Sequence, residues 1–204
     1  MACTEYIDCS NQSLSTEDII RKTITTDDEG CPAIRSTAVL KDVGNTVAIQ
    51  VTLTRPADTA VYAAKDTVAD STSAATVLIF DGAGRINNGT GYITGCRFET
   101  DQAANVSAYK IHLFRSAPAS VIEDNVAWTE DWDDRALRIG DIDIPALTNN
   151  GGASDTAKRE ITGLLIPYTC GSGTNDIVCQ IETVTGFTPT SGQLFFVELI
   201  LEQN

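Results

Sequence analysis

From Thr46 onward, apolar and polar side chains alternate along the chain. Val47, Ile49, Val51 and Leu53 are separated by polar or small residues, which is the pattern of a strand with one buried face. Similar stretches recur at short intervals between turn-forming residues, and no strong helical pattern separates them. The further expected strands cover residues 62–68, 76–80, 92–99, 109–114, 137–144, 160–168, 177–184 and 194–201.

Two of these strands indicate which side chains face the core. Because successive residues of a strand point to opposite faces, every second residue is expected to lie inside. The expected inward residues are Tyr92, Cys96 and Phe98 in 92–99, and Tyr109, Ile111 and Leu113 in 109–114, with Lys110 and His112 outside.

The stretch 194–201 is almost wholly apolar and follows the turn-forming residues 188–192. A short continuous apolar run of this kind predicts a strand that is covered on both faces. We therefore expect this strand to complete the core. A charge at Phe196 or Leu199 should accordingly abolish folding.

A series of about nine short strands predicts an all-β fold. We expect an antiparallel β-sandwich, with a jelly roll or a related Greek key as the leading topology.

Residues 1–40 are polar, turn-rich and only weakly periodic, so they are expected to form an extended N-terminal arm before a β-sandwich domain at 41–204. The sequence also predicts a short helix that starts near Ser15 and one helical turn around 125–128.

The chain is strongly acidic, which excludes several classes of partner. Its 14 basic and 28 acidic residues give a net charge of −14, and this field repels phosphate backbones. We therefore expect no nucleic acid partner.

No apolar run approaches the roughly twenty residues of a membrane-spanning helix, and the first residues lack the basic and apolar regions of a secretory signal. We expect no membrane association, and synthesis in a cytoplasm with free thiols.

The six cysteines allow a metal or a disulfide interpretation. Cys3, Cys9 and Cys31 lie in the predicted arm without CxxC spacing or a nearby histidine, so a zinc site is not expected there. Cys96 should be a small buried side chain. Cys170 and Cys179 flank the turn-like residues 171–176 and would face each other across a hairpin, where a disulfide is possible but not required.

No combination of residues indicates catalysis. His112, the one histidine, lies between Ile111 and Leu113 without a recognisable nucleophile or orienting partner, as general base chemistry would require. An acidic cluster provides oxygen ligands of the kind that calcium prefers, but it lacks EF-hand spacing. Solvated loop charges, partly paired with Arg135 and Arg138, are the simpler explanation of this cluster. That cluster comprises Glu123, Asp124, Glu130, Asp131, Asp133, Asp134, Asp141 and Asp143. We therefore predict no catalytic residue, no cofactor and no metal site.

Two further motifs have weak functional interpretations. Trp128 and Trp132 are four residues apart, a spacing that places both on one face of a helix. They would suit carbohydrate stacking or packing against the sandwich. The glycine-rich stretch 82–91 lacks the lysine and the strand-to-helix context of a phosphate loop, so it predicts a β-turn region.

An ordered series of short motifs from about Thr46 to the C-terminus resembles small virion proteins of tailed bacteriophages. The motifs are PADTAVYAAKDTV (56–68), GYI (91–93), IHLF (111–114), EDNVAW (123–128), GLLIPY (163–168) and the last strand. The order of the motifs carries the resemblance, and the cysteine-bearing arm lies outside it.

The resemblance implies a non-enzymatic capsid decoration, or cement, protein on the capsid surface of the virion, made in the host cytoplasm. Proteins of this kind are β-sandwiches that associate over the joints of a shell, so the implied partners are the major capsid protein and further copies of the chain, with a homotrimer expected. The predicted arm would grip the shell. A phage tail or baseplate structural protein, and a carbohydrate- or receptor-binding module, are the alternatives.

Overall fold

The computed structural model describes residues 24–26, 32–34, 45–151 and 156–204. The chain divides into two compact units, Met1–Val43 and Gly44–Asn204. In the first, β1 (Ile24–Thr26) pairs antiparallel with β2 (Pro32–Ile34). The helix predicted near Ser15 lies outside the described residues, as do Cys3, Cys9, Cys31 and most of the predicted arm.

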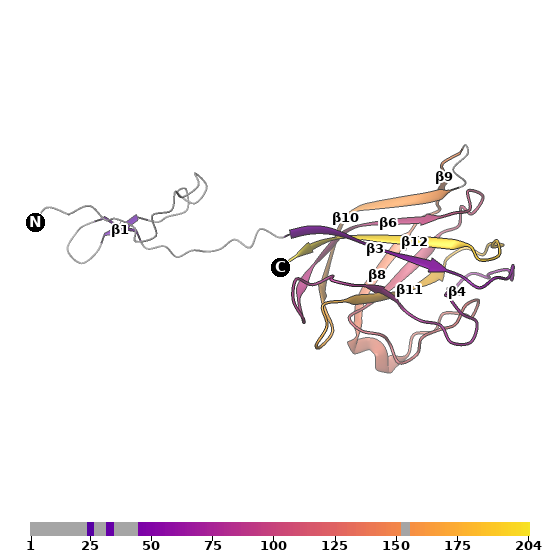
Figure 1. Cartoon of the computed structure of the whole chain (residues 1–204), viewed down its shortest axis with the longest axis horizontal. Coiled ribbons are helices and arrows are strands. Elements are labelled where there is room, and N and C mark those ends of the chain that lie inside the picture. Colours follow the sequence, from indigo (N-terminus) through magenta and orange to yellow (C-terminus); the bar gives the residue numbers. More distant parts are fainter. Residues whose placement is uncertain (1–23, 27–31, 35–44, 152–155) are drawn as a thin grey trace, which may run out of the picture. The chain divides into compact units, whose positions relative to one another are not determined.

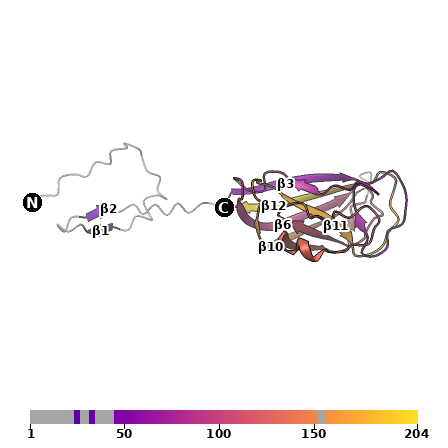
Figure 2. The ribbon, with the colours of Figure 1, turned by 90° about the horizontal axis from the view of Figure 1, so that it is seen from below.

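The unit Gly44–Asn204 consists of two antiparallel sheets, several of whose strands are labelled in Figure 1 and seen after a 90° turn in Figure 2. The first sheet has the order β3 (Asn45–Thr54), β12 (Leu194–Gln203), β6 (Thr90–Thr100), β10 (Ala157–Thr169) and β9 (Thr148–Asn149). The second has the order β4 (Thr67–Val68), β11 (Ile177–Thr183), β7 (Tyr109–Phe114) and β8 (Arg138–Ile144), and β5 (Leu78–Phe80) also pairs with β11. No helix among the described residues is long and apolar enough to cross a membrane.

The strand pairing is that of a jelly roll. Strands from the beginning of this unit pair with strands from its end, and the pairs continue inward along the chain. β3 pairs with β12, β4 and β5 with β11, β6 with β10, and β7 with β8. The β12–β6 and β11–β7 pairs then join these nested hairpins into two sheets. Two interlocked Greek keys of this kind define the jelly roll, so the predicted all-β fold and its leading topology are confirmed.

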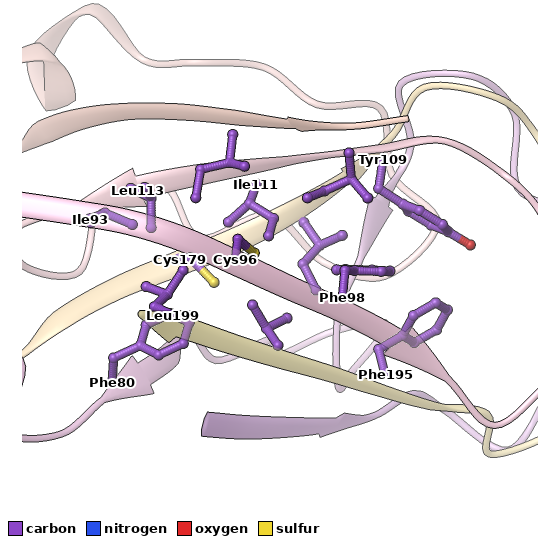
Figure 3. Packing of buried hydrophobic residues seen from close by; sticks show 14 of the residues in the cluster. Phe80, Ile93, Cys96, Phe98, Tyr109, Ile111, Leu113, Cys179, Phe195 and Leu199 are labelled. Atoms are coloured by element: carbon purple, nitrogen blue, oxygen red, sulfur yellow. The ribbon is translucent and has the colours of Figure 1, made fainter. Parts of the chain in front are cut away.

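The inner faces of the two sheets form one apolar core (Figure 3). The ring of Phe98 lies 4.8 Å from that of Tyr109 and 5.9 Å from that of Phe195, centroid to centroid. Cys96 of β6 and Cys179 of β11 meet from opposite sheets. Tyr109, Ile111 and Leu113 are fully buried, as predicted.

A β-bulge in β6 corrects the predicted face of Tyr92. Ile200 of β12 lies opposite Gly95, but Leu201 lies opposite Ile93, so Thr94 is an extra residue. One extra residue exchanges the faces of the side chains on either side of it. On the N-terminal side of Thr94, Ile93 is therefore buried and Tyr92 is 40% exposed. The predictions for Cys96 and Phe98 are confirmed.

The predicted strand 62–68 is mostly irregular, and only Thr67–Val68 forms β4. Lys65 has a positive φ of 72°, and the carboxylate of Asp66 accepts a hydrogen bond from the backbone N–H of Ala63. These contacts form a turn where the alternation predicted a strand. The strand expected at 76–80 is likewise shortened to β5, Leu78–Phe80.

The helical turn predicted at 125–128 is wrong. Asn125 has a φ of 59° and Ala127 forms a β-bridge with Asp66. The one helical segment of the described residues is η1 (Trp132–Ala136), a 3₁₀ helix whose N-cap Asp131 accepts a hydrogen bond from the N–H of Asp133. A carboxylate at this position satisfies an N–H group that has no partner inside the helix.

The last strand is covered on one face rather than two. Phe195, Val197, Leu199 and Leu201 are fully buried. The residues between them are partly exposed, which corrects the prediction that Phe196 belongs to the core.

Candidate functional site

The outer face of the β4-β11-β7-β8 sheet is covered by the connection between β7 and β8, residues 115–137, which we call the covering segment. The ring of Trp128 stacks on that of His112 at 3.9 Å with an interplanar angle of 1°. The buried side-chain amide of Gln180 on β11 donates to the carbonyl oxygen of Ile122, 3.1 Å away. These contacts remove the middle of this outer face from solvent.

His112 is therefore buried, whereas the sequence predicted it outside. It does point away from the core, but the residue is 3% exposed because the covering segment lies over it. Its Nδ1 is 2.9 Å from Asp141 Oδ1 and its Nε2 is 2.7 Å from Glu182 Oε2. Both ring nitrogens are occupied by carboxylates, and this arrangement holds the ring in place rather than activating a nucleophile.

Asp141 is held between His112 and Arg138. Besides contacting His112, it accepts hydrogen bonds from Arg138, which also pairs with Glu130. Burial opposes the ionisation of Asp141, but the hydrogen bond with His112 and the electrostatic interactions with His112 and Arg138 outweigh it. The pKa of Asp141 is therefore lowered from its ordinary value.

A second buried cluster joins Arg55, Tyr62 and Asp124. Arg55 Nε donates to Tyr62 Oη at 2.9 Å, and its Nη2 lies 3.2 Å from Asp124 Oδ2. The Tyr62 hydroxyl donates to Asp124 Oδ1 at 2.5 Å. Burial, and then the hydrogen bond to Asp124, raise the pKa of Tyr62 well above its ordinary value. Asp124 thereby ties the covering segment to the end of β3.

The acidic cluster considered for calcium is divided among separate structural roles. Asp134 accepts a hydrogen bond from the N–H of Ala119 at 2.9 Å, and Asp143 lies 3.4 Å from Lys110 Nζ. Asp124, Asp131 and Asp141 have the roles described above. In the part of the chain that the structure describes, no group of three or more His, Cys, Asp or Glu side chains is placed to hold a metal ion.

The two tryptophans do not form a common platform. Trp128 is half-buried against His112. Trp132 is 75% exposed, with the guanidinium of Arg135 4.5 Å from its ring centroid. Because no helix includes both residues, the prediction that they share a helix face is wrong.

Cys170 and Cys179 are free thiols, so the disulfide considered across the 171–176 turn is not formed. Both side chains are buried, Cys170 beside Gly84 and Cys179 in the core. Burial raises the pKa of all three described thiols, that of Cys96 to about 12. A thiol in such surroundings is not a nucleophile at neutral pH.

The outer face of the β3-β12-β6-β10 sheet is open in the described chain, and we call it the open face. The guanidinium of Arg97 lies over the ring of Phe196 on β12, 5.0 Å from the ring centroid. Arg97 Nη2 also lies 3.3 Å from Glu198 Oε2. A groove of about 330 Å³ lies on the open face beside Arg97 and Phe196. It is lined by Gln50, Thr52, Arg97, Glu99, Thr100, Asp101, Thr156, Leu194 and Phe196.

Sequence reasoning missed both the open face and the Arg55–Tyr62–Asp124 cluster. The period-two pattern of β3 identified its outward residues, but the apolar composition of β12 concealed that its outer face lacks a cover. Asp124 is 62 residues from Tyr62 and 69 from Arg55, so no local spacing could have indicated their contact.

No protein-family model and no curated protein matches this chain. Among solved structures, it is similar to chains in the structures of Triatoma virus, of a marine algae virus of the order Picornavirales, and of the native virion of Kashmir bee virus at acidic pH. The identities are 9%, 11% and 10%, and the TM-scores are 0.28, 0.26 and 0.26. The matches cover 98%, 100% and 98% of this chain and 86%, 85% and 82% of the other chains. Similarity at this level carries no argument about function, and the fold assignment depends on the strand pairing.

Proposed function

We propose that this chain is a non-enzymatic virion structural protein, a cement protein that binds the major capsid protein on the surface of a tailed-phage head. The observation that carries the proposal is the open face. It combines an aromatic ring, an arginine and carboxylates on a rigid sheet, and aromatic and arginine side chains are enriched where proteins bind one another. The motif series that resembles phage virion proteins supplies the class of partner.

The polar groups of the described chain support a binding role over a catalytic one. His112 has both ring nitrogens paired with carboxylates, and Asp124 is bonded to Arg55 and Tyr62. The groups that would have to titrate or attack in a reaction are thus occupied in holding the fold. A cement protein needs such a rigid scaffold, together with a surface that binds the shell.

The predicted arm at residues 1–40 would supply a second attachment. A polar segment that orders on a partner loses conformational entropy, which is offset by the area it buries. Its lack of strong apolar periodicity is compatible with such a role. The net charge of −14 would keep free copies soluble before assembly and favour docking on a neutral or basic shell.

The open face is tested with purified phage heads that lack this protein. Wild type, Phe196→Ser and the matched control Trp132→Ser are mixed with the heads, and bound copies are counted after co-sedimentation. Loss of an aromatic side chain at a binding centre typically costs about 2 kcal/mol or more, so we expect roughly thirtyfold weaker binding for Phe196→Ser. Trp132, an exposed aromatic residue outside the open face, should be replaceable without effect.

Equal binding by all three proteins would contradict a docking role for the open face. Binding to purified tails instead of heads would overturn the capsid assignment in favour of a tail or baseplate protein. Specific binding on a glycan array that is lost in Phe196→Ser would instead favour a carbohydrate-binding module.

The arm is tested separately by deleting residues 1–40. We expect the shortened chain to occupy fewer sites on the same heads at the same concentration. Circular dichroism checks that the β-sandwich is retained, and undiminished occupancy would remove the arm from the proposal.

A further inference from the structure

The free edge of β3 differs from every other sheet edge in the described chain. β3 is ten residues long and pairs with β12 alone, so its other side is an edge of the sheet. Its sequence, NTVAIQVTLT, has no charged residue and no proline. Because an unpaired strand edge is a template for another strand, proteins usually shorten it or place charges on it.

The other edges follow that rule. β9 and β4 have two residues each, and β5 has three. The part of β10 that β9 does not pair, 159–169, is long, but it contains Arg159, Glu160 and Pro167. β8 has seven residues, but Arg138, Asp141 and Asp143 are among them. A long uncharged edge is thus the exception in a chain with a net charge of −14.

The inward side chains of β3 are incompletely covered. Val47, Ile49 and Val51 pack against the core but remain partly exposed, whereas Leu53 is 3% exposed. A further strand beside β3 would extend the sheet and cover these three side chains. Burial of apolar surface and new backbone hydrogen bonds would both favour such an addition.

We propose that β3 pairs antiparallel with β3 of a second copy of this chain, about a two-fold axis through Gln50. In this register Val47 lies opposite Leu53 of the second copy, and Ile49 lies opposite Val51. All four apolar side chains then face the extended core, and polar or small residues meet on the outer face. A shift by one residue would put apolar side chains opposite polar ones.

Self-complementarity favours a second copy over an unrelated strand. Two copies repel each other at long range, but the nine residues paired on each side, 46–54, are uncharged, so no charges are juxtaposed within the strand pair. Two-fold, self-complementary contacts are also the commonest form of self-association. Pairing at β3 gives species with an even number of chains: a dimer, or a hexamer if the predicted trimer forms through another surface.

Cysteine cross-linking tests the register. Directly opposite side chains have Cβ atoms about 5 Å apart, which suits a disulfide after slight adjustment. Under mild oxidation, Gln50→Cys should give roughly ten times more covalent dimer than the matched variant Thr52→Cys, whose two copies would lie about 14 Å apart along the strand. Wild type, with its six native cysteines, gives the background on non-reducing gels. Equal cross-linking by the two variants would overturn the proposed register.

A charge at the axis tests the association itself. Gln50 lies opposite Glu198 in its own sheet, so Gln50→Lys should fold normally but bring two lysines together in the pair. By light scattering, we expect the mass of the variant to be half that of wild type at the same concentration. Wild-type association should strengthen with salt, because screening weakens the repulsion between acidic chains.

An unchanged mass in Gln50→Lys, or a wild-type chain that is monomeric or strictly trimeric, would overturn the proposal. Cross-linking of Gln50→Cys to a head protein instead of to a second copy would overturn it as well. None of these results depends on whether the chain binds heads through Phe196, so the pairing and the proposed function fail independently.

Discussion

The two sheets of the sandwich share one core but have different outer faces. On β7 and β11, outward His112 and Glu182 are buried beneath the covering segment. On β6 and β12, outward Arg97 and Glu198 remain in contact with solvent, with side chains 37% and 19% exposed. The same kinds of residue therefore serve the fold on one sheet and are available for binding on the other.

The difference originates in the connections rather than in the strands. The connection between β7 and β8 is long enough to cross the sheet, and Asp124 anchors it to Arg55 and Tyr62. Because burial removes water from charged groups, each one needs a close partner beneath this segment. The open face has no such requirement, because Arg97 and Glu198 keep contact with solvent.

The largest expected effect separates the two faces of β12. Leu199→Asp places a charge in the core, where Leu199 is fully buried, and should cost about 4 kcal/mol or more, leaving little folded protein. Phe196→Asp lies on the open face and should cost about 1–2 kcal/mol. Circular dichroism and urea unfolding measure both, and similar stabilities would contradict the assignment of the two faces.

The anchor of the covering segment should have the next largest effect. Asp124→Asn removes one of the two carboxylates that contact buried Arg55, whose Nη2 also lies 2.9 Å from Asp58 Oδ1, and losing a charged hydrogen bond of this kind costs about 1.5–3 kcal/mol. Asp133→Asn is the matched control, because the Asp133 side chain is 91% exposed and its replacement should change stability by about 0.5 kcal/mol or less. A stability of Asp124→Asn close to that of the control would show that the anchor contributes little.

Beneath the covering segment, Asp141 should make stability depend on pH. Its folded-state pKa is lowered, so its contribution is fully present above the unfolded pKa of about 3.9 and is lost as the pH falls through the folded value. The difference in unfolding free energy between wild type and Asp141→Asn should therefore shrink as the pH falls below about 4. A difference that persists unchanged into stronger acid would contradict the role of its charge.

The periodicity of the chain predicted much of the sandwich. Alternation in β3 and β7 located these strands and their inward residues, because a local period of two is what a half-buried strand requires. It failed at Tyr92, where Thr94 adds a residue to β6 and exchanges the faces. It also failed at 62–66, where side-chain hydrogen bonds form a turn.

The candidate sites were less predictable because they depend on contacts between distant segments. Whether His112 is exposed depends on Trp128, which belongs to a connection that no strand pattern describes. In the same way, Phe196 looked like a core residue, and only the absence of a cover over β12 in the described chain shows otherwise. Local patterns indicate which face a residue occupies, but not what lies above that face.

The smallest expected effect concerns the ion pair on the open face. Arg97 and Glu198 are 3.3 Å apart and partly exposed, and a pair of this kind contributes about 0.2–1 kcal/mol. A double-mutant cycle with Arg97→Ala and Glu198→Gln, measured by urea unfolding, should give a coupling in this range that decreases with salt. A coupling of about 3 kcal/mol, typical of a buried pair, would mean that these two charges stabilise the fold as strongly as those beneath the covering segment, and that they are not free to exchange partners.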